Sequence, residues 1–399
     1  MSSAAALWRK LERESSGYRN SVTLELDEAL FVGVDVADLL RMLARDDSSW
    51  PGVLLRVFVD GDRRRRRWEQ RVLDAPPAPG EPLEAWFERL FPRGGVALLL
   101  MSAERYSEPF ARRCAWLTRP VRERCDPGRH EVEGMLLLAR DCTTPFGVHR
   151  DNPGSLALHT ATGPGTKRML SWTALDHDPR VYRDADACPP PDGVHPLEPR
   201  SLHLLPNGLR WHMGEVRGFS VGLALALRRL EDAELVSGAL RSYSDRAPTE
   251  TQPTREFDPR PGPQPLRPVA GPQVRARDWV AQLVAHHRAE RSSNAGHRVP
   301  PCLDPDEVRP GARIRRLADF PLEHEKGSQR LLLWARGRPF SFRHHTVLAE
   351  LLARLATEPC RWEAVDTLVR IFSDRLEAPA LLAILTHLLR AGALEQAWP

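Results

Sequence analysis

The sequence has no uninterrupted apolar run of the roughly 18 residues that a membrane-spanning helix needs. Its first residues, MSSAAALWRKLERESSGYR, alternate apolar and charged side chains and lack the apolar core of a signal peptide. They are typical of an amphipathic helix. We therefore expect a soluble protein without membrane partners that is not exported.

The cysteines are few, and their spacing does not suit a metal site or a set of disulfides. The chain has six cysteines and no C-x-x-C pair, and they are widely scattered, at Cys114, Cys125, Cys142, Cys188, Cys302 and Cys360. This spacing argues against a zinc module and against a disulfide framework. A reducing, cytoplasmic location fits such a chain best.

The excess of positive charge is small. The formal charge is +4 over 399 residues, and much of the local excess lies in one run, GDRRRRRWEQ. The five arginines from Arg63 to Arg67 could bind phosphates or an acidic peptide. A solvated hairpin or loop explains the same run, and we favour that interpretation.

The hydrophobic fraction of 42% and charged fraction of 28% are those of a globular protein. Before residue 131, alternating and helical periods follow one another, which predicts an α+β fold. From about 131 to 230, short apolar runs are separated by Gly, Pro, Asn and Asp. This region is typical of an antiparallel sandwich or barrel, and we assign residues 1–245 to one domain.

The remaining chain predicts three further segments. Residues 246–275 are too rich in proline to hold a core and form a linker, and 276–320 form a helical connecting segment. Residues 321–399 combine a strand, turn and strand with three helical patterns, which suggests a winged-helix-like domain. From residue 343 onward six arginines face seven acidic residues, so packing, dimerisation or peptide docking is favoured over direct nucleic-acid binding.

The sequence FGVHRDNPGS, at residues 146–155, contains an H-x-D motif that is expected about once by chance in such a chain. On a strand, His149 and Asp151 would point to the same face. His212 follows a strand and a Pro-Asn-Gly turn and precedes a returning strand. Two imidazoles and one carboxylate are the ligands of a non-haem iron facial triad.

Four ordered motifs then carry a family resemblance: F-G-x-H-x-D, G-T-K-R-x-x-x-W, L-P-x-G-x-x-W-H and F-S-V-x-L-A-L. In this order they resemble the JmjC and cupin-like iron(II) and 2-oxoglutarate-dependent oxygenases. The resemblance implies a double-stranded β-helix (a jelly roll) with its core at about 131–230. It implies oxidative decarboxylation of 2-oxoglutarate to succinate and CO2, with hydroxylation of a C–H bond. It also implies that His149, Asp151 and His212 are the iron ligands.

By the same resemblance Lys167 holds the distal carboxylate of 2-oxoglutarate, and a buried carboxylate does need a charge-assisted partner. Arg168 is the alternative, because neighbours on a strand face opposite ways. Thr144 and Ser155 could donate hydroxyls to the cosubstrate, although a threonine in TTPFG also suits a turn.

Three further residues near these motifs have structural interpretations. Trp211 could line the active site or belong to the hydrophobic core. We assign His159 and His203 structural roles, because three protein ligands already complete the triad.

The order of segments resembles the ribosomal oxygenases, which hydroxylate protein side chains and dimerise. It implies a peptide or protein substrate and a homodimer. Because Asp151 is kept, hydroxylation is favoured over halogenation, which needs that coordination position for chloride. Hydroxylation of a free amino acid or other small metabolite, demethylation, and a non-catalytic cupin-like binding or regulatory protein stay open as alternatives.

Overall fold

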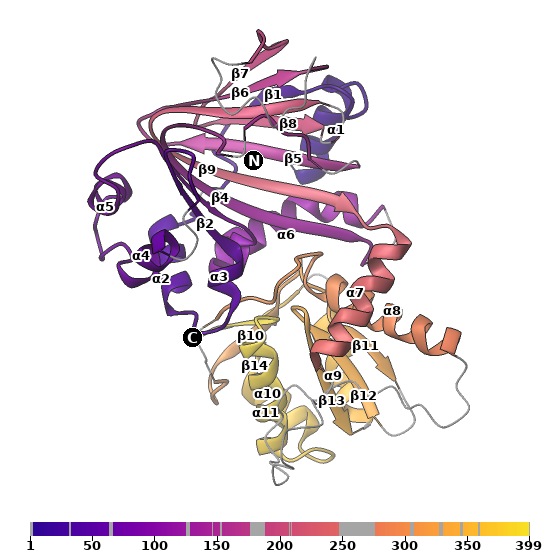
Figure 1. Cartoon of the computed structure of the whole chain (residues 1–399). Coiled ribbons are helices and arrows are strands. Elements are labelled where there is room, and N and C mark those ends of the chain that lie inside the picture. Colours follow the sequence, from indigo (N-terminus) through magenta and orange to yellow (C-terminus); the bar gives the residue numbers. More distant parts are fainter. Residues whose placement is uncertain are drawn as a thin grey trace. The chain divides into compact units, whose positions relative to one another are not determined.

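The computed structural model of the chain describes residues 3–31, 33–63, 67–124, 128–145, 147–151, 154–175, 188–206, 208, 210–246, 276–303, 307–326, 330–343, 346–357 and 360–398. They form two compact units, Met1–Pro120 with Val132–Arg229, and Val121–Glu131 with Leu230–Pro399. The predicted mixed α+β class is confirmed (Figure 1). No helix within the described ranges is both long and apolar enough to cross a bilayer.

The first unit combines short amphipathic helices with a large sheet. The helices are α1 (Ala4–Glu14), α2 (Val36–Arg45), α3 (Trp50–Leu54), α4 (Arg67–Asp74), α5 (Leu83–Leu90), the 3-10 helix η1 (Ala103–Tyr106) and α6 (Glu108–Arg122). Helix α1 begins at a Ser3 cap that accepts from the amide of Ala6, and α2 begins at an Asp35 cap. Each buries its apolar stripe, as the helical period of its sequence predicts.

Nine strands form one sheet with the order β1-β8-β5-β9-β4-β3-β2, and β6 and β7 extend it beside β9. The strands are β1 (Val22–Glu25), β2 (Leu55–Val59), β3 (Val96–Leu100), β4 (His130–Thr143), β5 (Ser155–Thr162), β6 (Thr166–Trp172), β7 (Gly193–Leu197), β8 (Ser201–Pro206) and β9 (Trp211–Arg229). All the pairings with a described register are antiparallel, as the short runs of the sequence predict.

Strand β9 gives the sheet its curvature. Its first part pairs with β6 and its second part pairs with β5, and Gly218 lies between the two parts with a φ of 71°. A side chain at Gly165, opposite this bend, would come within 2.6 Å of the carbonyl of Arg217. Glycine tolerates the positive φ at position 218 and the close backbone contact at position 165. These two glycines therefore allow β9 to bend and to pair with β6 before the bend and with β5 after it.

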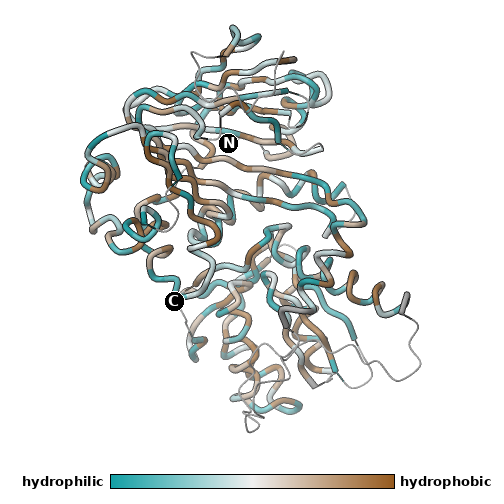
Figure 2. The backbone as a smooth tube through the Cα atoms, in the orientation of Figure 1, coloured by the Kyte–Doolittle hydropathy of each residue, from teal (hydrophilic) through white to brown (hydrophobic). Residues whose placement is uncertain are grey.

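The strands β3 and β4 are apolar on both faces. Even-numbered residues such as Leu98, Leu136 and Leu138 are fully buried, whereas the odd-numbered Leu99 and Leu137 are only partly buried. Figure 2 shows the hydrophobic residues concentrated along these central strands. One face therefore belongs to the core, and the other is free to line a cavity.

The second unit is built on two three-stranded sheets. Strands β10 (Arg313–Arg316), β14 (Glu363–Ala364) and β15 (Leu394–Ala397) form one, and β11 (Glu323–Lys326), β12 (Arg330–Ala335) and β13 (Arg338–Arg343) form the other. The helices are α7 (Asp232–Arg246), α8 (Ala276–Ser293), α9 (Thr346–Ala356), α10 (Val365–Phe372) and α11 (Ala378–Arg390). Leucines of α9 and α11 supply much of its core.

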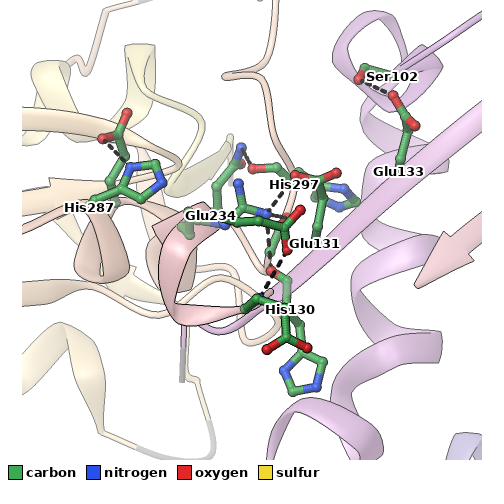
Figure 3. Close-up of polar contacts among 12 residues, drawn as sticks. Ser102, His130, Glu131, Glu133, Glu234, His287 and His297 are labelled. Atoms are coloured by element: carbon green, nitrogen blue, oxygen red, sulfur yellow. Dashed lines mark hydrogen bonds and ion pairs between the residues drawn. The ribbon is translucent and has the colours of Figure 1, made fainter. Parts of the chain in front are cut away.

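Polar contacts tie residues 121–131 to this unit. The Arg291 guanidinium on α8 donates to the carbonyl of His130 at 3.1 Å and to the Glu131 carboxylate at 3.4 Å. Figure 3 shows the surroundings of His130 and Glu131, together with the hydrogen bond from Ser102 to Glu133 in the first unit. The first two residues of β4, His130 and Glu131, therefore belong to the second unit.

The predicted domain limits differ from this division. Helix α7 packs against α8 in the second unit, whereas the sequence suggested one domain through residue 245. A helix packs where its apolar face finds a partner, and that cannot be read from its own sequence. Of the predicted linker, all but residue 246 lies outside the described residues, as do Arg64–Arg66 of the arginine run.

Candidate active site

A β-bridge brings the H-x-D motif to the start of β9. His149 and His212 exchange both backbone hydrogen bonds, at 3.0 and 2.8 Å, in an isolated antiparallel pair. Their rings lie 4.0 Å apart between centroids. Asp151, two residues farther along, turns its carboxylate toward both rings. Residues about sixty positions apart in the chain are thus placed together by backbone pairing alone.

The three side chains converge on one point. The His149 Nε2 atom lies 3.8 Å from Asp151 Oδ1, and His212 Nε2 lies 3.7 Å from Asp151 Oδ2. One ligand atom from each of the three lies within 4.8 Å of the others, and no other such group occurs among the described histidines, cysteines and acids. These separations are longer than hydrogen bonds, and they leave space for an ion between the atoms.

The electrostatics of the group favour a divalent cation. Burial lowers the pKa of His149 and of His212, so both imidazoles are neutral and offer lone pairs at neutral pH. Burial raises the pKa of Asp151, and the neighbouring His149 offsets part of that rise. In one tautomer His149 donates from Nδ1 to the Gly147 carbonyl at 3.1 Å and turns Nε2 toward Asp151. Two imidazoles and one carboxylate are the ligand set of iron(II) oxygenases, and the arrangement fits that ion.

A cavity of about 290 Å³ adjoins the three residues. Its walls are formed mainly by odd-numbered residues of β3 and β4 and by residues of β5, β6 and β9 that face them. The lining is mostly apolar, with a few convergent polar groups, which is typical of a small-molecule site. Its residues include Arg56, Leu99, Met135, Leu137, Cys142, Thr144, His159, Lys167, Met169, Gly214, Val216 and Gly222.

Lys167 and Arg168 face opposite sides of β6. The side chain of Lys167 is buried in the cavity, and burial lowers its pKa to about 8. Arg168 points outward, half-exposed, and pairs with Glu215 on β9. No described residue forms an ion pair with Lys167. The lysine therefore places an uncompensated positive charge in the cavity that also reaches the His149, Asp151 and His212 group.

The two hydroxyl candidates differ in position. Thr144 lines the cavity, and its Oγ1 accepts from the amide of Gly214 at 2.7 Å. Ser155 is the first residue of β5 and does not line the cavity. His159 on the same strand does, and four residues of extended chain, about 13 Å, separate the two.

The residues assigned to the core have mixed positions. His203 is buried, and its Nδ1 lies 3.0 Å from the Thr23 hydroxyl, in keeping with a structural role. His159 instead faces the cavity with a buried, unpartnered Nε2 atom. Trp211 does not line the cavity but packs against an apolar cluster beside it, with the Arg150 guanidinium 4.8 Å above its ring.

Two cavity residues were not predicted from the sequence. Gly222 passes directly under the lysine, and a side chain there would approach Lys167 Nζ to 2.7 Å. Arg56 enters the cavity from β2. The signal for Arg56 was a single charged residue inside the apolar run VLLRVFV, at residues 53–59. Gly222 is the variable position of the motif F-S-V-x-L-A-L, and its role could not be predicted there because it depends on a lysine of another strand.

No protein-family model matches the sequence, and no curated protein matches it by sequence. The X-ray structure of E. coli ycfD matches with a TM-score of 0.50 and 18% identity, covering 97% of this chain and 98% of that one. The chain shares the fold of YcfD. The predicted resemblance is thus confirmed at the level of the fold.

Further YcfD structures give similar values. The one described as E. coli ribosomal oxygenase YcfD has a TM-score of 0.49 and 18% identity, over 97% of this chain and 98% of the other. A structure of YcfD with cobalt and 2-oxoglutarate has a TM-score of 0.48 and 17% identity, over 98% of each chain. At these identities YcfD is evidence for the fold, and the activity must be argued from the site.

Proposed function

We propose that the chain is an iron(II)- and 2-oxoglutarate-dependent oxygenase that hydroxylates a side chain of a protein or peptide. The observation that carries the proposal is one cavity that holds both a facial group of two neutral histidines and an aspartate and, at a distance, a buried unpaired lysine. A 2-oxo acid needs such a pair of features, because it carries a chelating end and a distal carboxylate.

Each residue then has a defined task. His149, Asp151 and His212 would hold iron(II), which when bound supplies the oxygen chemistry that couples decarboxylation of the oxo acid to hydroxylation. Lys167 would bind the distal carboxylate, and the apolar wall around it strengthens that ion pair by excluding water. Thr144 accepts a hydrogen bond from Gly214, which stands on β9 between His212 and Val216, the direct partner of Lys167. Asp151 occupies the position that a halogenating enzyme would need for chloride, so hydroxylation is the expected outcome.

The substrate class is supported by the fold. YcfD is described as a ribosomal oxygenase, and its likeness extends over both units of this chain. A second unit as large as this one has no evident task in an enzyme for a free amino acid. We therefore place a peptide or protein first and a small metabolite second.

The function is tested by aerobic incubation with iron(II) and 2-oxoglutarate, with succinate as the readout. We expect succinate from the wild type and none above background from His149→Ala. Coexpression with candidate peptides should add one oxygen atom to a peptide by intact mass, in the wild type alone. No succinate with any peptide pool, together with purified protein that binds no iron, would favour a non-catalytic binding protein.

Gly222→Ala should weaken 2-oxoglutarate binding by roughly tenfold without unfolding the protein. The added methyl would meet Lys167 Nζ at 2.7 Å, and the flexible lysine would move away from its place. Calorimetric titration of 2-oxoglutarate under anaerobic conditions measures the effect. Gly52→Ala is the control, because nothing lies within 4 Å of its added methyl. Equal affinities in the two variants would separate Gly222 from the cosubstrate site.

Further features complete the proposal. We propose that the strands from β4 to β9 form a double-stranded β-helix, that the last strands and helices form a winged-helix-like domain, and that the protein forms a homodimer. The cytoplasmic location and the absence of direct nucleic-acid binding stay predictions from the sequence.

A further inference from the structure

Arg56 is a second positive charge in the cavity, and neither the metal ligands nor the cosubstrate accounts for it. It lies on β2, the edge strand of the sheet, with its side chain on the face that lines the cavity. Its Nε atom is buried without a hydrogen-bond partner, and no described acidic residue pairs with it. A guanidinium in an apolar strand that has no partner of its own is typical of a ligand-binding group.

The register of the strands separates Arg56 from Lys167. Arg56 is the direct partner of Leu99, and Leu99 is the direct partner of Leu137, so the three lie in one row. At about 4.8 Å per strand, Arg56 starts about 10 Å from Leu137. A side chain at Gly222 would lie 3.6 Å from Leu137 Cβ and 2.7 Å from Lys167 Nζ. The lysine is therefore at the far end of this row from the arginine.

The wall between the two cations is apolar. Leu99, Leu137 and Met135 face the cavity there and carry no polar side-chain group that would bind a ligand by hydrogen bonds. A molecule on this wall would place an aliphatic chain along the leucines and an anionic group against the arginine. A planar guanidinium binds a carboxylate through two parallel hydrogen bonds, which makes it selective for that group.

We propose that Arg56 binds a carboxylate of the molecule that is hydroxylated, whose aliphatic part lies along Leu99 and Leu137. The assignment of this group to the substrate rests on the proposed function, in which Lys167 is already occupied by the cosubstrate. The carboxylate belongs either to an acidic side chain of a peptide or to a small free acid. Arg56 would thus select acidic substrates and hold them at a fixed distance from the metal.

The experiment compares charged and neutral probes of equal shape. Hexanoate is titrated against hexanamide, and the blocked tripeptide acetyl-Ala-Glu-Ala-amide against its glutamine analogue, with binding followed by ligand-observed NMR. The full-length proteins are the wild type, Arg56→Met, Arg56→Lys and Lys167→Met. Each is measured with zinc(II) and 2-oxoglutarate present and again without them.

We expect the wild type to bind the charged member of at least one pair about tenfold more tightly than the neutral one. With zinc(II) and 2-oxoglutarate present, Arg56→Met should abolish the preference and Arg56→Lys should keep part of it. Without them, Lys167→Met should still show the preference, because Arg56 is then the one Lys or Arg side chain left among the described lining residues. A preference in the hexanoate pair alone indicates a free acid, and one in the peptide pair indicates an acidic side chain.

Three results would overturn the inference: equal binding of both members of each pair by the wild type, an unchanged preference in Arg56→Met, or loss of 2-oxoglutarate binding in a folded Arg56→Met variant. The last would make Arg56 an anchor of the cosubstrate. The titrations without zinc(II) and 2-oxoglutarate do not depend on turnover. A chain that fails to convert 2-oxoglutarate can therefore still pass or fail this test of Arg56.

Discussion

Asp151→Ala is expected to bind iron(II) at least about 100-fold more weakly than the wild type and to lose turnover of 2-oxoglutarate. Loss of residues that only orient metal ligands costs about 10- to 100-fold in affinity, and loss of a ligand itself should cost more. Asp151 is also the one anionic member of the group, since burial keeps both histidines neutral. Anaerobic calorimetry with iron(II) measures the change.

The same variant separates metal binding from folding. Burial raises the pKa of Asp151, which means that its charged form is destabilised in the protein without a cation. Its removal should therefore leave the melting temperature of the metal-free protein unchanged or higher. Asp38→Ala is a matched control, because Asp38 lies exposed at the start of α2 and pairs only with Arg41 among the described residues. Iron affinity of Asp151→Ala within a few-fold of this control would rule out the metal centre.

The three proposed metal ligands could be named from the sequence through the resemblance that the four ordered motifs carry, because an H-x-D motif alone is expected about once by chance. His149 and Asp151 lie two residues apart, and extended chain turns such residues to one side. His212 follows the sequence Pro-Asn-Gly, which predicts a turn. What the sequence could not supply was the pairing of His149 with His212, which depends on the folded register of two distant segments.

Register explains the remaining differences as well. Whether Lys167 or Arg168 faces inward depends on the register in which β6 pairs with β7 and β9. The sequences of these strands do not determine that register. His159 resembles a core histidine in sequence, because both environments are apolar. Short strands such as β14, with two residues, are below the length at which periodicity can be read.

Lys167→Met should weaken 2-oxoglutarate binding by at least about 30-fold, because removing one partner of a buried, hydrogen-bonded charge pair costs about 2–5 kcal/mol. Methionine keeps much of the aliphatic stem and removes the charge, so the cavity keeps its shape. Iron(II) affinity should be unchanged, since Lys167 is not one of the three metal-ligating residues. Titration of 2-oxoglutarate into the metal-loaded protein without oxygen measures the loss.

Arg168→Met is the matched control for this variant. Arg168 is the neighbour on the same strand, and it forms an ion pair with Glu215 outside the cavity. Its loss should change 2-oxoglutarate affinity by less than about twofold, because an exposed ion pair contributes little. If both variants bind 2-oxoglutarate as the wild type does, the carboxylate must be held elsewhere in the cavity, and Arg56 becomes the one remaining cationic side chain among its described lining residues. If the Arg168 variant alone loses affinity, strand β6 must face the other way in solution, and Lys167 would then lie outside the cavity.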